Sequence, residues 1–120
     1  MTGHFRQTIR AAELIVFALF TASCGSSEAV RQSVNDDRFI FAAEDVLKAK
    51  LRDPSSAEFT NVRVSRTAGV PAACGEVNSR NGFGGMTGPQ RFISGGAAVL
   101  ESEMEPSEFA KSWAQLCGAA

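Results

Sequence analysis

The chain has few of the side chains that most enzymes use to move protons. It contains no tyrosine and a single histidine, His4, among its 120 residues. A general acid or base has to be a titratable group within reach of the substrate, so a catalytic site here would depend on carboxylates. Zinc sites combine several cysteine or histidine ligands, and too few remain once the cysteines are assigned below. We therefore expect no metal ion and no cofactor.

Long runs of one residue class are also missing. Lys and Arg number 12 against 13 Asp and Glu, a net charge of −1, and the two signs are mixed along the chain. Without a basic run, binding to nucleic acid has no electrostatic support. The main apolar run, residues 14–22, would span roughly 14 Å as a helix, about half of the hydrocarbon core of a bilayer. This length argues against a permanent transmembrane helix.

The N-terminal residues have the layout of an export signal. Arg6 and Arg10 precede the apolar run, and small residues follow it up to Ser23. Charge, a short apolar core and small residues are typical of a secretory signal peptide, here residues 1–23. Cys24 comes directly after the small residues, and this arrangement resembles a bacterial lipoprotein signal, in which the cysteine carries the lipid. Several acyl chains on Cys24 would give a stable membrane anchor.

The resemblance to lipoproteins also implies a location. Gly25 follows Cys24, and in a Gram-negative host a glycine there is compatible with transport to the outer membrane, with the protein facing the periplasm. The alternative is ordinary cleavage after Ser23, which would release a secreted or periplasmic soluble protein.

Two cysteines remain after Cys24 is assigned to lipid. In an exported protein, Cys74 and Cys117 are expected to form one disulfide bond. The alternative is two separately buried thiols. A bond that closes a loop of this length would stabilise a small domain substantially, because such a domain buries only a modest fraction of its surface.

The remaining pattern predicts one small domain, residues 36–120, after a lipid-anchored flexible tether, residues 24–35. An apolar stripe at three- and four-residue spacing predicts a helix over residues 37–52. Alternating residues predict strands over 60–65, 72–79, 90–94 and 97–101. A second helix is expected from Pro106, because proline suits a first helical turn. We predict an α+β fold in which a four-stranded antiparallel meander carries both helices on one face.

Residues 81–89 form a glycine-rich connection that includes Phe83 and Met86. A phosphate-binding loop would need a helix after the glycines, usually with a Lys and a Ser or Thr, whereas a strand is predicted to follow. The alternative is a wide turn in which glycines adopt positive φ. Phe83 and Met86 on such a loop are candidates for a contact surface.

Glu76, Asn78 and Arg80 recur at every second position and are predicted to lie on one face of a strand. They extend the candidate contact surface. A second hypothesis makes Glu76 the general acid of an enzyme, with Asn78 and Arg80 binding the substrate. A third is structural, with Glu76 paired across strands to Arg63 or Arg91.

A linked set of motifs resembles a family of small exported proteins from bacteria and their phages. The matching positions are 53–59, 61–62, 74–78, 81, 83–85, 88 and 91–92. The resemblance implies export and no catalytic residue. We therefore expect a small cell-envelope lipoprotein that acts as a binding module, with the membrane as one partner and an envelope protein or the cell wall as another. The alternatives are an enzyme acting on an envelope polymer through Glu76 and a phage-derived factor that blocks a surface molecule.

Overall fold

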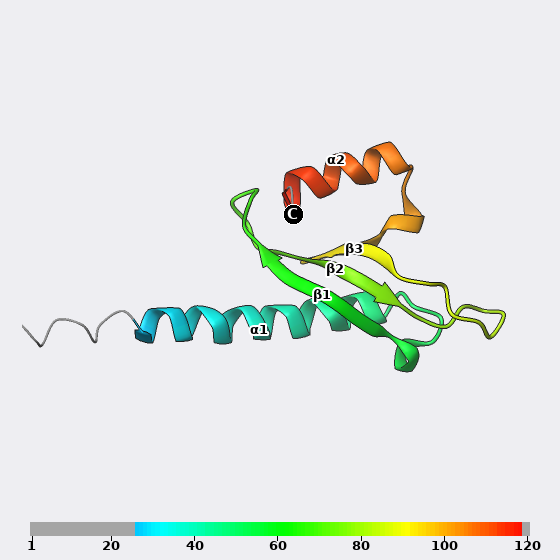
Figure 1. The fold of residues 1–120 in the computed structure, drawn as a ribbon, viewed down its shortest axis with the longest axis horizontal. Coiled ribbons are helices and arrows are strands. Elements are labelled where there is room, and N and C mark those ends of the chain that lie inside the picture. The colour runs from blue at the N-terminus through cyan, green and yellow to red at the C-terminus, as the bar shows by residue number, and fades with distance from the viewer. Residues whose placement is uncertain (1–25, 119–120) are drawn as a thin grey trace, which may run out of the picture. The chain divides into compact units, whose positions relative to one another are not determined.

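The computed structural model describes residues 26–118. The elements in chain order are α1 (Ser26–Lys48), β1 (Glu58–Ser65), β2 (Ala72–Asn78), β3 (Gln90–Ser94), β4 (Ala98–Leu100) and α2 (Pro106–Leu116), with two short 3₁₀ turns, η1 (Pro54–Ser56) and η2 (Glu101–Glu103) (Figure 1). The four strands form one antiparallel sheet in the order β1-β2-β3-β4. The predicted α+β class and the predicted meander are therefore confirmed. The predicted signal peptide and Cys24 lie outside the described residues.

Helix α1 begins earlier than the sequence predicted. It starts at Ser26 and ends at Lys48, whereas residues 37–52 were expected. Residues 26–34, predicted as a flexible tether, are helical, so that part of the prediction is wrong. This segment contains no glycine or proline that would interrupt a helix, and Glu28 in the first turn suits the helix dipole.

The first residues of α1 belong to a different compact unit from the domain. The compact unit of the fold begins at Ser33, and residues 27–35 are all exposed. No helix in residues 26–118 combines the length and the apolar character needed to cross a bilayer. A spacer role for the segment before Ser33 stays a prediction.

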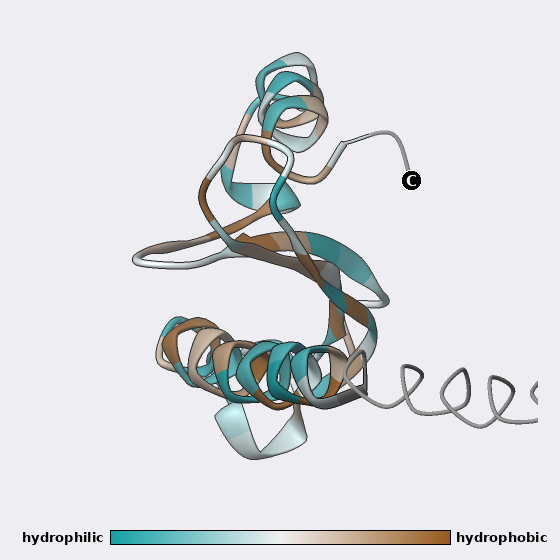
Figure 2. Cartoon of the chain, turned by 90° about the vertical axis from the view of Figure 1, so that its left-hand side faces the viewer, coloured by the Kyte–Doolittle hydropathy of each residue, from teal (hydrophilic) through white to brown (hydrophobic). Residues whose placement is uncertain are grey.

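The two helices pack on opposite faces of the sheet, not on one face as predicted. The residues of α1 that follow Ser33 cover one face with Ala43 and Leu47, and α2 covers the other with Phe109. Figure 2 shows the sheet between the two helices. The α1 face of the sheet contributes Ala73, Val77, Phe92 and Leu100, and the α2 face contributes Ala72, Cys74 and Ile93.

The composition of β2 and β3 explains this correction. Both strands bury consecutive residues, Ala72 to Gly75 in β2 and Phe92 to Ser94 in β3. Successive side chains of a strand point to opposite faces, so a strand with consecutive buried residues needs cover on both sides. One helix on each face provides that cover.

The core on the α1 face is closed by direct packing. Phe92 is fully buried and meets the ring of Phe59 edge-on, with a centroid separation of 5.7 Å. The hydroxyl of Ser94, also fully buried, donates to the carbonyl of Ala43 at 2.7 Å. This bond satisfies the buried hydroxyl and joins β3 to α1.

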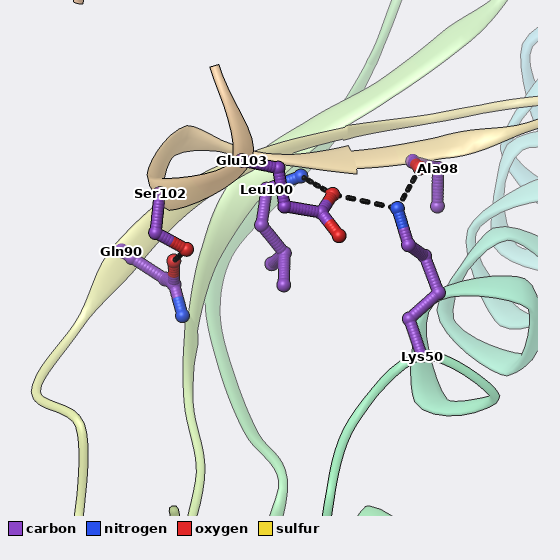
Figure 3. A network of polar contacts seen from close by, with 6 residues as sticks. All are labelled: Lys50, Gln90, Ala98, Leu100, Ser102 and Glu103. Atoms are coloured by element: carbon purple, nitrogen blue, oxygen red, sulfur yellow. Dashed lines mark hydrogen bonds and ion pairs between the residues drawn. The ribbon is translucent and has the colours of Figure 1, made fainter. Parts of the chain in front are cut away.

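Beyond the end of α1, Lys50 joins the helix to the end of the sheet (Figure 3). Its Nζ donates to the carbonyl of Ala98 at 2.7 Å and to Oε2 of Glu103 at 2.6 Å. The same carboxylate oxygen accepts from the backbone N–H of Leu100 at 2.9 Å. Burial raises the pKa of Glu103, but the bonds from Lys50 and Leu100 outweigh it, so that the pKa is lowered. One carboxylate thus holds β4, η2 and the turn after α1.

On the α2 face, a disulfide bond joins the sheet to the end of the helix. Cys74 in β2 is bonded to Cys117, with a Cα–Cα distance of 6.0 Å and a sequence separation of 43. The predicted pairing is confirmed. Gly118 then adopts a φ of +72° and donates to the carbonyl of Trp113 at 3.1 Å. A glycine in this left-handed conformation commonly ends an α-helix.

Candidate functional site

A β-bulge in β1 shapes the surface beside α2. The pairing register of β1 with β2 shifts between Thr60 and Arg63. Asn61 lies in this interval with a φ of +53°, the one positive value among the non-glycine residues that the structure describes. Asparagine tolerates this region better than most residues. Such strained positions tend to occur where a side chain has been redirected for a purpose.

Gly75 makes room for the bulge on the neighbouring strand. A Cβ on Gly75 would lie 2.9 Å from the Cα of Val62, so no larger residue fits there without movement of the backbone. Val62 packs into the core on the α1 face. The residues on either side of Val62, Asn61 and Arg63, line a pocket on the other side of the sheet.

This pocket has a volume of about 280 Å³ and lies between the sheet and α2. Its wall combines side chains of β1, β2, β3 and α2. The residues that carry its chemistry are Asn61, Arg63, Glu76, Arg91 and Trp113. We call it the α2 pocket. Cys74, which forms the disulfide bond with Cys117, belongs to the same wall.

Arg91 is held in place from two directions. Its Nη2 donates to Oε1 of Glu101 at 2.8 Å, and its Nε and backbone N–H donate to Oε2 of the same residue at 3.3 and 3.2 Å. The guanidinium carbon lies 5.2 Å from the ring centroid of Phe109 and 5.1 Å from that of Trp113. Hydrogen bonding from Arg91 lowers the pKa of Glu101, and the same bond raises the pKa of Arg91. Arg91 is therefore a fixed cation whose charge Glu101 balances.

Glu76 and Arg63 line the same pocket, and the charged neighbour of Glu76 is Arg91, opposite it across the strands. Glu76 receives one long hydrogen bond, 3.5 Å, from the hydroxyl of Thr60. Arg63 donates through Nη2 to the carbonyl of Cys117 at 2.7 Å. Within residues 26–118 neither side chain forms an ion pair. Glu76 lies directly opposite Arg91 across the strands and interacts with it electrostatically, in line with one of the two predicted pairings, but the direct ion pair of Arg91 is with Glu101.

The enzyme hypothesis required Glu76 in a pocket beside a second carboxylate. The first condition is met. The second is not, because Glu76 is the one carboxylate among the residues that line this pocket, and Glu101 is bound to Arg91. Two carboxylates with separate roles are the usual requirement for hydrolysis of a glycosidic polymer. The described residues also bring together no group of three or more potential metal ligands.

The other predicted contact residues belong to a different site, the loop of residues 80–88. Asn78 uses its side-chain oxygen to accept the N–H of Gly88 at 3.0 Å. Arg80 pairs with Met86 in an isolated β-bridge, and its N–H donates to the hydroxyl of Ser56 at 2.8 Å. The structure thus separates Glu76, which lines the α2 pocket, from Asn78 and Arg80, which serve the loop.

The loop is internally hydrogen-bonded. The N–H of Asn81 donates to the carbonyl of Gly85 at 2.8 Å. The side-chain oxygen of Asn81 accepts the N–H groups of Phe83 and Gly85 at 2.9 and 3.2 Å. These N–H groups are therefore not free to bind phosphate, which supports the turn interpretation of the glycines. Gly84 and Gly88 take φ values of +86° and +82°, as that interpretation required.

The loop presents its apolar residues to solvent. Phe83 is 100% exposed and Met86 is 43% exposed. Arg52 and Arg80 line a small hollow of about 150 Å³ at the base of the loop, and neither forms an ion pair with a described residue. The surface next to Phe83 is therefore cationic.

No protein-family model matches the chain, and no curated protein or solved structure is detectably similar to it. The resemblance to small exported proteins therefore stays a prediction.

Sequence reasoning missed four residues of the α2 pocket as parts of a site, namely Asn61, Arg63, Arg91 and Trp113. A partial signal was present: Asn61 stands inside a run of alternating apolar residues, where asparagine is disfavoured in a regular strand.

Proposed function

We propose that the protein is a lipid-anchored binding module of the cell envelope, and that it contacts a partner through the loop of residues 80–88. The partner is an envelope protein or wall polymer that offers an apolar recess flanked by negative charge. Lipid on Cys24 would hold the domain at a membrane, most simply the outer membrane facing the periplasm.

The observation that carries the proposal is Phe83. An aromatic side chain that is completely exposed has no role in the stability of the fold, and aromatic residues are frequent energetic anchors of interfaces. The hydrogen bonds of Asn81 fix the backbone on which Phe83 stands. A pre-ordered loop loses less conformational entropy on binding, so the arrangement suits recognition.

The charge of the neighbouring surface supports the choice of partner. Arg52 and Arg80 add two cations at the base of the loop. Complementary charge favours encounter with an acidic partner and excludes a basic one. The disulfide between Cys74 and Cys117 is consistent with export, because such bonds persist in oxidising compartments.

Mass spectrometry of the protein from its native cells tests the anchoring. The expected species begins at Cys24 with attached acyl chains and contains the Cys74–Cys117 bond. Cys24→Ser should abolish acylation and move the protein from the membrane fraction to the soluble fraction. An acylated chain that still begins at Met1, or a chain without acylation, contradicts the anchoring.

Capture of partners from a detergent extract of the same envelope tests the loop. The wild-type chain should retain one or more specific components, and Phe83→Ala should lose them. Val70→Ala is the matched control, because Val70 is also exposed (58%) on a turn but lies outside the loop. If Phe83→Ala and Val70→Ala retain the same components as the wild type, the loop is not the contact surface. Arg80→Gln should weaken capture and reduce its dependence on salt.

A further inference from the structure

The α2 pocket contains charged side chains that take no part in the apolar core and that do not belong to the proposed contact loop. It shares no residue with the loop of residues 80–88. Its volume, about 280 Å³, is near the lower end of the range for small-molecule sites, about 300–1,000 Å³. A ligand the size of an amino acid or a dipeptide fits this volume.

The charges of the pocket wall indicate the class of ligand. Arg91 is balanced by Glu101 through a two-point ion pair. Arg63 and Glu76 form no direct ion pair with a described residue, and Glu76 interacts electrostatically with Arg91, whose direct partner is Glu101. A ligand with only a negative charge would be attracted by Arg63 but repelled by Glu76. A ligand with only a positive charge would be attracted by Glu76 but repelled by Arg63. A ligand with both charges satisfies both residues.

Neighbouring residues contact each of these two charged groups. The bond from Arg63 to the carbonyl of Cys117 anchors the guanidinium against the disulfide-linked end of α2. The bulge at Asn61 lies between Arg63 and Thr60, the residue that contacts Glu76. Trp113, under Arg91, supplies an apolar wall. A rigid frame of this kind lowers the entropy lost when a ligand binds.

We propose that the α2 pocket binds a zwitterionic ligand of amino-acid or short-peptide size. Its ammonium group pairs with the carboxylate of Glu76, its carboxylate pairs with the guanidinium of Arg63, and an apolar side chain contacts the indole of Trp113. Asn61 adds an amide that can donate to or accept from the peptide group.

The chain contains its own reporter for the test. Trp113 is the only tryptophan, and there is no tyrosine, so intrinsic tryptophan fluorescence of the full chain reports on this pocket alone. The probe is the dipeptide alanyl-alanine, titrated to millimolar concentration, with calorimetry as a second measurement. N-acetylalanine, which keeps only the carboxylate, and alaninamide, which keeps only the ammonium group, are the matched probes.

Alanyl-alanine should produce a saturable change and should bind about tenfold or more tightly than either matched probe, because each of those loses one charge-assisted bond. Glu76→Gln should weaken alanyl-alanine by a similar factor while leaving N-acetylalanine equal or tighter. Arg63→Gln should do the reverse, favouring alaninamide. Glu105→Gln and Lys111→Gln, which change exposed residues outside the pocket, should leave the affinity unchanged.

The opposite pattern would overturn the proposal. It fails if none of the three probes changes the fluorescence or releases heat, or if Glu76→Gln leaves the ranking of the probes as in the wild type. Thermal unfolding of each variant shows whether it is folded. If Arg63→Gln does not fold, the probe ranking measured with Glu76→Gln decides the proposal. Phe83→Ala should bind alanyl-alanine like the wild type, because Phe83 lies outside the α2 pocket. This variant therefore separates a failure of the ligand proposal from a failure of the proposed contact loop.

Discussion

The two faces of the sheet are built differently. The α1 face is closed by apolar side chains that interlock, with Phe92, Leu47 and Val77 all at or near zero exposure. The α2 face is held by a shorter helix, one disulfide bond and an arginine between two aromatic rings. Apolar packing, with the one buried hydrogen bond from Ser94 to Ala43, fills the first face, whereas covalent and polar contacts hold the second while leaving a pocket open. The more open face is where a ligand can bind, and its stability depends on fewer contacts.

Removal of a large side chain from the α1 face should have the largest effect. Phe92→Ala would leave a cavity in the fully buried core and is expected to lower the free energy of unfolding by about 3–5 kcal/mol. Urea denaturation measures the change. Phe41→Ala is the control, because Phe41 is 66% exposed on α1, and a change within about 0.5 kcal/mol is expected. Equal losses in the two variants would contradict the core assigned to this face.

Loss of the disulfide should act mainly on the α2 face. The chain-entropy relation for a 43-residue separation gives about 4 kcal/mol as an upper value, and about 2–4 kcal/mol is the expected loss for a Cys74→Ala, Cys117→Ser variant. Amide hydrogen exchange should show faster exchange first in α2, with the last turns of α1 still protected. Uniform loss of protection on both helices would show that the two faces are not separable.

Acid should weaken the ion pairs that Glu101 forms with Arg91 and Glu103 forms with Lys50. The pKa values of Glu101 and Glu103 are lowered from an ordinary 4.5 by their hydrogen bonds. The unfolded state therefore binds more protons than the folded state just below that value, and the stabilisation, complete above about pH 4.5, is lost as pH falls through the folded pKa values. Glu44 acts in the opposite sense, because burial raises its pKa.

Glu101→Gln should make the decline of stability in acid shallower and should cost about 0.5–1 kcal/mol at neutral pH, since both partners of this ion pair are 39% exposed. Denaturation series from pH 3 to pH 7, run on this variant and on Glu105→Gln, measure the difference. A steeper decline in Glu101→Gln than in the wild type would contradict the role of the Arg91–Glu101 pair.

The smallest effect is expected at Lys50. Lys50→Met removes the bonds to Ala98 and Glu103, but the ion pair is about one-third exposed, so a loss of about 0.5 kcal/mol is expected. The matched control is Lys111→Met, because the Lys111–Glu108 pair is more exposed and lies within one helix. Its effect should be smaller than that of Lys50→Met. The reverse order would show that the link between α1 and β4 contributes nothing.

The positions of the strands were predictable because local pattern and turn chemistry define them. Residues 90–94 alternate between glycine-containing turns, and β3 has these bounds. The start of α1 was not predictable in the same way. Asn35 to Asp37 are good helix-capping residues, yet they lie inside the helix, and Asp36 forms an ion pair with Arg66. Residues that favour a helix N-cap mark a possible start of a helix. They can also lie inside a longer helix when the residues before them are helical.

The site was only partly predictable. Glu76 was identified from the spacing of polar residues on β2, but its neighbours come from other parts of the chain, Arg63 from β1 and Trp113 from α2. The bulge that redirects Asn61 and Arg63 depends on the missing side chain of Gly75 on the next strand. Contacts between residues so far apart in sequence leave little local trace.

The amino-acid sequence by itself predicted the α+β class, the antiparallel strands, the helix that begins at Pro106 and the pairing of Cys74 with Cys117. These follow from periodicity, turn residues and the count of cysteines, which are properties of neighbouring residues or of the whole composition. Only the tertiary structure decided that the helices cover opposite faces and that Arg63, Glu76 and Arg91 share one pocket. The physical reason is that packing and ion pairing depend on all the residues that the fold brings together. Arg91, for example, forms its direct ion pair with Glu101 and not with Glu76.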